Sequence, residues 1–288
     1  MKRITCFKYR TISSALRCLV DGSLYFARPD QLNDSLEVKF DSASPADYTQ
    51  VFWKTLSEIS EQRGEGRLTV APLLSDEFIL VNNEENERFQ DACRNIGIFS
   101  AARRPNHQAM WAYYAEDGRG VCFELDWAQE YLNKNGLLPV DVLYADHARV
   151  HNRAEDWRTA FMDMARRHPD ATFDELKEMS LSEDERRRYG IISTARAASV
   201  KHTDWAHENE IRLIAGRSGT KKILADVLRR VHFIRMDGED FGKIIDILNQ
   251  TYPKVELVMW ELHHGEITMK PRLVRFVPIE AEDTDKSP

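Results

Sequence analysis

Hydrophobic residues along this chain form short clusters whose spacing changes from strand-like to helix-like and back. The run ITCFKY (4–9) is typical of a first strand. In 11–22 the apolar residues recur at helical spacing and end at the glycine stop Gly22. SLYFARP (23–29) then predicts a second short strand, which its proline ends. The chain therefore opens with a strand, a helix and a strand.

The rest of the chain continues this mixture without a regular strand–helix rhythm. We predict helices at 45–63, 84–95, 107–115, 154–200 and 239–250. We predict further strands at 95–102, 121–126, 137–145, 210–216, 229–236, 255–260 and 267–274. This order favours an α+β fold with a mixed or antiparallel sheet. We expect one domain over 1–280, with helical insertions at about 45–95 and 154–200, followed by an acidic disordered tail at 281–288.

Composition narrows the class of protein. The chain has 288 residues, of which 42% are hydrophobic, enough for a sizeable core, and its net charge of −7 argues against a general nucleic-acid binder. The cysteine spacing matches no zinc or redox motif, and the N-terminal MKRITCFKYR lacks the apolar segment of a signal peptide. No uncharged stretch reaches membrane-spanning length. We therefore expect a cytoplasmic protein with reduced cysteines and no membrane partner.

Several common catalytic motifs are absent from the sequence. Neither G-x-x-x-x-G-K nor G-x-G-x-x-G occurs, which argues against P-loop enzymes and Rossmann dehydrogenases. No G-x-S-x-G supports a hydrolase nucleophile. The histidine pairs His147/His151 and His263/His264 lack a third ligand, so we interpret both as surface histidines and expect no metal site.

Two polar or aromatic clusters have both a structural and a functional interpretation. Asn33 and Asp34 are first of all a turn or helix-cap signal, but they could line a pocket. Trp111, Tyr113 and Tyr114 are typical of core packing, but such rings also form walls on which a nicotinamide or a base stacks. Spacing does not decide between these alternatives.

The strongest chemical candidate is the stretch KHTDWAHENEIRLI (201–214). Glu208 and Glu210 point to one face if the strand has already begun, and a buried pair of like charges would raise one carboxyl pKa. Arg212 continues the same face. From spacing alone, the ion pair with Arg212 is the favoured interpretation.

Several motifs in a fixed order resemble a bacterial family known only as a domain of unknown function. They are FKYR (7–10), GSLYFARPDQLNDSLE (22–37), MWAYYA (110–115), GVCFELD (120–126) and WAHENEIRLI (205–214). The ordered set spans most of the chain, and Ser35 and Leu36 stand where that family usually has proline and phenylalanine. Members of the family often lie near phage-defence or mobile-element genes, which implies a defence or toxin role.

A weaker resemblance is to the ADP-ribosyltransferase fold, a compact α+β domain with a split sheet. It implies NAD as co-substrate, Glu210 as the catalytic carboxylate and Glu208 as the residue that positions the acceptor. The residues that it implies for NAD binding are Tyr9 or Arg10 on the first strand, the aromatic residues Trp111 and Tyr114, and Asn33 and Asp34. A carboxylate bonded to the ribose would stabilise the positive charge that develops when the nicotinamide bond breaks.

The resemblances imply an ADP-ribosyltransferase or NAD glycohydrolase that acts as a toxin or phage-defence effector. Its acceptor would be protein, nucleic acid or water, and a neutralising protein is a further expected partner. The alternative is a non-catalytic sensor or adaptor in which the glutamates form a structural network. A metal-dependent nuclease, in which the paired carboxylates would hold Mg²⁺, is a weaker third hypothesis. The chain is acidic overall and has no obvious basic surface to bind phosphate.

Overall fold

The computed structural model describes residues 3–34, 38, 40–41, 44–64, 76–146, 151–235, 238–262 and 269–274. The strands are β1 (Arg3–Arg10), β2 (Leu24–Phe26), β3 (Phe40–Asp41), β4 (Gly97–Ala102), β5 (Val121–Ala128), β6 (Leu137–Asp141), β7 (Leu143–Ala145), β8 (His151–Asn152), β9 (Val200–His202), β10 (Glu210–Ala215), β11 (Gly219–Lys221), β12 (Leu228–Phe233), β13 (Glu256–Leu262) and β14 (Met269–Val274). The helices are α1 (Ile12–Asp21), α2 (Pro45–Arg63), α3 (Asp76–Asn95), α4 (Gln108–Tyr114), α5 (Gln129–Lys134), α6 (Arg153–Arg167), α7 (Phe173–Ser180), α8 (Glu183–Ala197), α9 (Leu224–Val227) and α10 (Glu239–Thr251).

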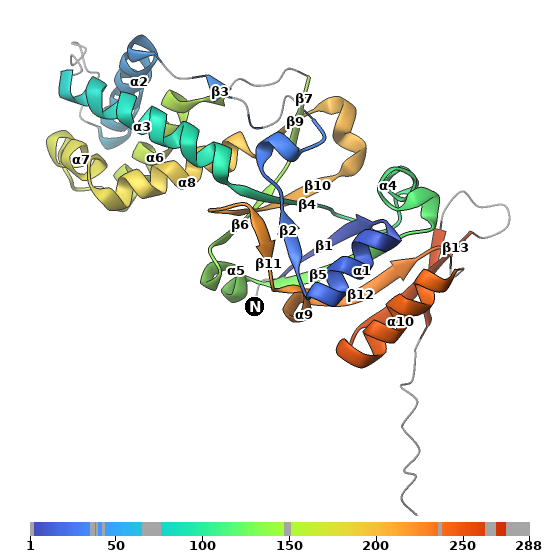
Figure 1. Cartoon of the computed structure of the whole chain (residues 1–288). Helices are drawn as coiled ribbons and strands as arrows, with labels where there is room; N and C mark the ends of the chain where they lie inside the picture. The colour runs from blue at the N-terminus through green and yellow to red at the C-terminus, as the bar shows by residue number, and fades with distance from the viewer. Residues whose placement is uncertain are drawn as a thin grey trace, which may run out of the picture.

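Within the described residues, eight strands form the central sheet in the order β14-β13-β12-β5-β1-β4-β10-β6 (Figure 1). β12 and β13 run parallel, and every other neighbouring pair in this sheet is antiparallel. The parallel pair is joined through α10, as a parallel connection requires a crossover. The prediction of an α+β fold with a mixed sheet is therefore confirmed.

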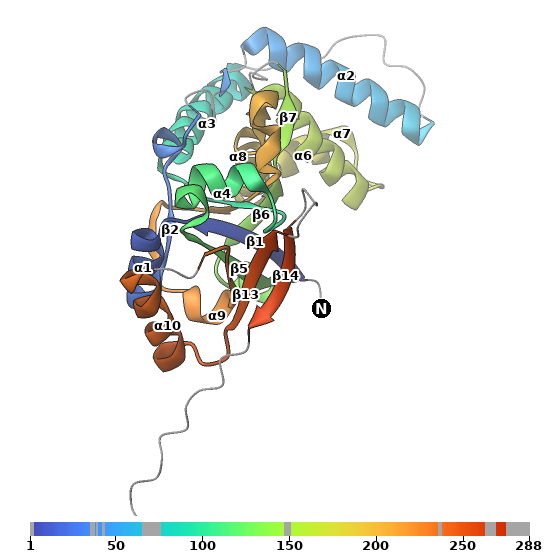
Figure 2. The ribbon, with the colours of Figure 1, turned by 90° about the vertical axis from the view of Figure 1, so that its right-hand side faces the viewer.

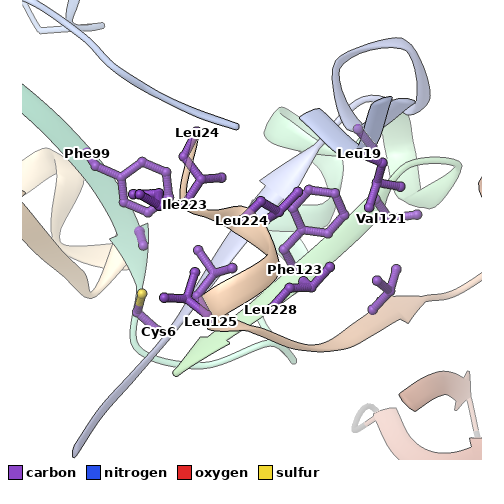
Figure 3. Close-up of a cluster of buried hydrophobic side chains, with 14 of the residues drawn as sticks. Cys6, Leu19, Leu24, Phe99, Val121, Phe123, Leu125, Ile223, Leu224 and Leu228 are labelled. Carbon is purple, nitrogen blue, oxygen red and sulfur yellow. The ribbon is translucent and has the colours of Figure 1, made fainter. Parts of the chain in front are cut away.

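One face of this sheet carries the largest apolar core. Phe123 and Leu125 of β5 and Leu19 of α1 are fully buried there, with Leu224 of α9 (Figure 3). Helices α1 and α10 lie side by side over the same core (Figures 1 and 2). α1 ends where predicted, because Gly22 adopts the left-handed conformation (φ 62°) that closes a helix. Burying these side chains contributes roughly 1.5–3 kcal/mol each.

The two helical insertions, far apart in sequence, pack against each other. Tyr48 and Phe52 of α2 share a buried cluster with Trp157 and Phe161 of α6, and Tyr189 of α8 completes it. Figure 2 shows α2, α6, α7 and α8 gathered at the end of the molecule away from β13 and β14. Helix α3 packs beside the sheet through a second cluster that includes residues of β4 and β10. The expected single domain over 1–280 stays a prediction, and the tail at 281–288 lies outside the described residues.

The strands β1 and β4 meet only briefly. Phe7 and Ala102 form the one register pair between them in the described structure, whereas β1 pairs with β5 along its whole length. Further along β4, Ile98 pairs instead with Ala27, which follows β2. The sheet therefore opens between the end of β1 and the middle of β4.

Some predicted elements differ from the structure in their boundaries. The predicted strand at 137–145 is two strands, because the chain leaves the sheet at Val142 and β7 pairs with β9. The helix predicted at 84–95 begins at Asp76. The predicted helical block 154–200 is three helices followed by β9. No helix in the described part of the chain is both long and apolar enough to span a bilayer.

Candidate functional site

A cavity of about 220 Å³ lies where β1 and β4 diverge. The end of β1, from Phe7 to Arg10, forms one wall, which we call the β1 wall. A second wall, which we call the β10 wall, contains Lys201, Glu208 and Glu210. Other lining side chains come from β2, β4, α4 and the turn after β2; they include Tyr25, Asn33, Ser100, Met110 and Tyr114.

The two glutamates of the β10 wall do not share a strand face. Glu208 ends a 3₁₀ helix (Thr203–Glu208), and Asn209 adopts a left-handed conformation with φ 44° before β10 begins at Glu210. Asparagine tolerates this conformation better than most residues. The carboxylates meet instead at Lys201, whose Nζ lies 2.6 Å from Glu208 Oε2 and 3.3 Å from Glu210 Oε2. A buried lysine therefore brings the pair together.

Glu210 forms the ion pair with Arg212 that the spacing favoured. Arg212 Nε and Nη2 donate to the two carboxylate oxygens at 2.8 and 3.0 Å, and its Nη1 donates to the Ala198 carbonyl oxygen. Burial alone would raise the pKa of Glu210, but the adjacent Arg212, helped by Lys201 and a hydrogen bond from Ser100, lowers it to about 2. Glu210 is therefore a permanent carboxylate near neutral pH.

Glu208 has a different set of partners, which face the cavity. Tyr114 Oη donates to Glu208 Oε1 at 2.5 Å, and Asn33 Nδ2 donates to the same oxygen at 3.2 Å. Asn33 also donates to Tyr114 Oη at 2.7 Å. Burial and the bond to Glu208 raise the pKa of Tyr114 well above its ordinary value, so its hydroxyl stays protonated.

The β1 wall carries two cations without ion-pair partners among the described residues. Lys8 Nζ donates to the Ser100 carbonyl oxygen at 2.5 Å, across the gap between β1 and β4. Burial, and then the nearby Arg10, lower the pKa of Lys8 to about 8. Arg10 makes a long hydrogen bond to Ser14 Oγ, 3.4 Å, and its buried Nε has no hydrogen-bond partner. An anion in the cavity would satisfy both groups.

Other predicted site residues lie behind or beside the cavity. Tyr9 lines it but is buried, and its hydroxyl donates to the Arg104 carbonyl oxygen at 2.9 Å. Trp111 packs edge-on against Tyr9 with ring centroids 5.2 Å apart, donates to the Pro105 carbonyl oxygen, and belongs to the core rather than to the described cavity lining. Asp34 is buried next to Asn33 and is likewise not among the described lining residues.

The sequence analysis missed Lys8, Lys201 and Ser100. Lys8 and Arg10 are two residues apart in β1, and this spacing could have predicted that both lie on one face of the strand. Lys201 lies seven and nine residues before the glutamates, too far along a regular helix or strand for the side chains to touch. The 3₁₀ helix Thr203–Glu208 turns the chain so that Lys201 lies beside the glutamates, and no local sequence pattern predicts this contact.

No group of three or more His, Cys, Asp or Glu side chains in the described structure is placed to hold a metal ion. His147, His263 and His264 lie outside the described residues, as does the side chain of His151. The four cysteines, Cys6, Cys18, Cys93 and Cys122, are free, and burial raises the pKa of the Cys6 and Cys93 thiols to about 12. These thiols are therefore poor nucleophiles.

Comparison with known families gives one match. Residues 110–213 match the model of a family described as "Protein of unknown function (DUF2971)". No curated protein and no solved structure matches the chain. The matched segment includes Tyr114, Lys201 and both glutamates of the cavity, whereas β1 lies before it. The ADP-ribosyltransferase resemblance stays a prediction, and the resemblance to an uncharacterised domain-of-unknown-function family is confirmed over residues 110–213.

Proposed function

We propose that the cavity binds NAD and that the protein cleaves its nicotinamide–ribose bond, as an ADP-ribosyltransferase or NAD glycohydrolase. One observation carries the proposal. The cavity places Lys8 and Arg10, two cations without ion-pair partners in the described part of the chain, opposite the carboxylates of Glu208 and Glu210. NAD has the complementary polarity, because its pyrophosphate is anionic and its nicotinamide ribose becomes cationic during cleavage.

The charge pattern supports one orientation of the substrate. The pyrophosphate would contact Lys8 and Arg10, since a guanidinium and an ammonium are the side chains that bind phosphate oxygens most strongly. The nicotinamide ribose would then lie against Glu208 of the β10 wall and Tyr114 of α4. The volume of about 220 Å³ is smaller than the roughly 300–1,000 Å³ of typical ligand pockets. The adenosine end would therefore lie outside the cavity.

The chemistry requires no metal. The bond between ribose C1′ and the nicotinamide nitrogen breaks, and its electron pair neutralises the pyridinium ring as nicotinamide leaves. Glu210, with its pKa of about 2, supplies a fixed negative charge beside the oxocarbenium-like sugar. The acceptor, a protein or nucleic-acid group or water, then attacks C1′ and loses its proton to Glu208.

The decisive experiment measures nicotinamide release from NAD by the purified protein and by Glu208→Gln. We expect the variant to lose about 100-fold or more of the release rate, as for removal of one transition-state partner. Glu185→Gln is the matched control, because Glu185 is also paired with a cation, Arg167, but lies in α8 outside the described cavity lining. Glu210→Gln serves as a second variant once its stability has been measured.

Two results would contradict the enzyme proposal: no nicotinamide release with water, protein or nucleic-acid acceptors, or equal release by wild type and Glu208→Gln. Binding is tested separately by the shift in melting temperature with NAD and with ADP-ribose. Arg10→Met should abolish that shift, whereas Arg3→Met, at the other end of the same strand, should not.

A second function is favoured by one specific feature of the β10 wall. All four oxygens of Glu208 and Glu210 accept hydrogen bonds, as expected of a structural network in a non-catalytic sensor. In that case NAD or ADP-ribose would still raise the melting temperature through Lys8 and Arg10, but no nicotinamide would appear. The two assays together therefore separate an enzyme from a sensor.

A further inference from the structure

A second, larger cavity lies between the helices and the edge of the sheet, away from the cavity between β1 and β4. Its volume is about 600 Å³. Its walls come from α3, α8, the α5–β6 connection and the end of β10. Apolar side chains dominate the lining, among them Phe89, Ile96, Leu132, Leu137 and Ile214. This composition suits the apolar body of a small molecule.

A glycine in the middle of a helix keeps one wall of this cavity open. Gly190 lies in the interior of α8, where glycine is a poorer helix former than alanine. Its backbone angle does not require glycine, and a Cβ built there would meet no atom within 4 Å. The fold therefore gives no packing reason for glycine at this position. Gly216, which follows β10 on the same cavity lining, has the same freedom.

The charged residues of this lining all have one sign. Arg88, Arg153 and Arg187 line the cavity, and no described lining residue is acidic. Arg153 is almost fully buried, with its guanidinium 4.3 Å from the ring centroid of Phe89 and 4.7 Å from that of Tyr189. Arg187 is exposed and has no carboxylate partner among the described residues. The positive charge thus lies beside an apolar interior.

We propose that this cavity binds an amphipathic anion, a small molecule with an apolar body and a single carboxylate, sulfate or phosphate group. The apolar body lies against Phe89, Leu137 and Ile214, and the space beside Gly190 accommodates it. The anionic group pairs with Arg187 at the rim. A neutral amphiphile fits the same volume but leaves Arg187 without a counter-charge, and a cationic one is repelled. The proposal does not depend on the function of the cavity between β1 and β4.

Calorimetric titration with three probes of equal chain length tests the proposal: decanoate and decyltrimethylammonium below their micelle concentrations, and decan-1-ol below its solubility limit. We expect saturable binding in the order decanoate, then decanol, with no binding of the ammonium compound. Arg187→Gln should weaken decanoate about tenfold and leave decanol unchanged, because it removes one charge-assisted hydrogen bond.

Gly190→Leu tests the space itself. Leucine is a better helix former than glycine, so this variant should fold at least as well as wild type. We expect it to weaken decanoate about tenfold or more, because the added side chain occupies the cavity. Gly190→Ala is the matched control, since it makes the same change in helix propensity with little added volume, and should bind within about twofold of wild type. Equal affinity of wild type and Gly190→Leu, or equal binding of the anionic and cationic probes, would overturn the proposal.

Discussion

The charged side chains of the β1 wall and of the β10 wall differ in whether they have partners of opposite charge. On the β10 wall, Glu208, Glu210 and Lys201 are buried and, together with the buried Arg212, form a network of hydrogen bonds. On the β1 wall, the cation Lys8 contacts the Ser100 carbonyl oxygen and the ring of Phe99 but no carboxylate among the described residues, and the buried Nε of Arg10 has no hydrogen-bond partner there. The first arrangement stabilises the fold, whereas the second leaves charge for something else to satisfy. The difference predicts that charge removal will have opposite signs on the two walls.

The largest effect should follow removal of Arg212. Arg212→Met leaves the buried carboxylate of Glu210 without its bidentate partner, and we expect a loss of about 3–5 kcal/mol in the free energy of unfolding. Urea denaturation measures it. Arg230→Met is the control, because Arg230 pairs with Glu124 and Glu256 on a partly exposed surface and should cost less than about 1 kcal/mol. Equal losses in the two variants would remove the distinction between buried and exposed pairing.

Removal of the Glu210 charge should have the next largest effect and should depend on pH. Glu210→Gln keeps a hydrogen bond to Arg212 but loses the charge, so we expect a cost of about 2 kcal/mol at pH 7. The folded-state pKa of Glu210 is lowered from 4.5 to about 2, so its stabilising contribution is present above pH 4.5 and is lost as pH falls toward 2. The stability difference between wild type and variant should shrink over that range. A difference that stays constant from pH 5 to about 2 would show that Glu210 is not held as a carboxylate by Arg212.

Tyr114→Phe should have a smaller effect. It removes the hydroxyl that donates to Glu208, but Asn33 and Lys201 still satisfy that carboxylate. We expect a loss of about 1 kcal/mol by urea denaturation. Tyr113→Phe is the adjacent control, because Tyr113 is 72% exposed and its hydroxyl should contribute nothing measurable. If Tyr113→Phe cost as much, the loss would reflect the helix rather than the bond to Glu208.

The smallest effect should have the opposite sign. Lys8→Met removes a cation whose pKa burial lowers from 10.5 to about 8, so we expect a gain of about 0.5 kcal/mol at pH 7. The folded protein releases this proton before the unfolded chain does, so the penalty of the ammonium is full below pH 8 and disappears as pH rises from 8 to 10.5. The gain should vanish over that range. Lys243→Met, an exposed control, should show neither effect, and a destabilised Lys8→Met would mean that both walls are structural.

The elements were largely predictable from sequence because their signals are local. The apolar pattern of β1, the glycine that ends α1 and the helix 45–63 all appear in the structure at or near the predicted residues. The break at Val142 was not predictable, because the apolar pattern continues through it while the strand changes partners from β10 to β9. Tertiary pairing, rather than propensity, decides that boundary.

The candidate site was predictable only in part for the same physical reason. Glu210 and Arg212 are two apart on one strand, so their pairing follows from strand geometry. Lys201 reaches the glutamates through a 3₁₀ turn and a left-handed asparagine, and Lys8 reaches Ser100 across strands that are 92 residues apart in sequence. These contacts depend on the fold as a whole, so the local spacing of residues does not predict them.

The brief meeting of β1 and β4 has a mechanical consequence. This point divides the central sheet into two groups of strands, β14 to β1 and β4 to β6. In the described structure the register pair Phe7–Ala102 joins them. Within the described residues, widening the cavity at this point would break the Phe7–Ala102 pair and no other pair of the central sheet. Backbone amides at the joint should then exchange hydrogen faster than those of Cys6 and Leu125 in the β1–β5 pair. Such a joint would let the width of the cavity adjust to the molecule bound in it, because that width depends on the angle between the two groups of strands.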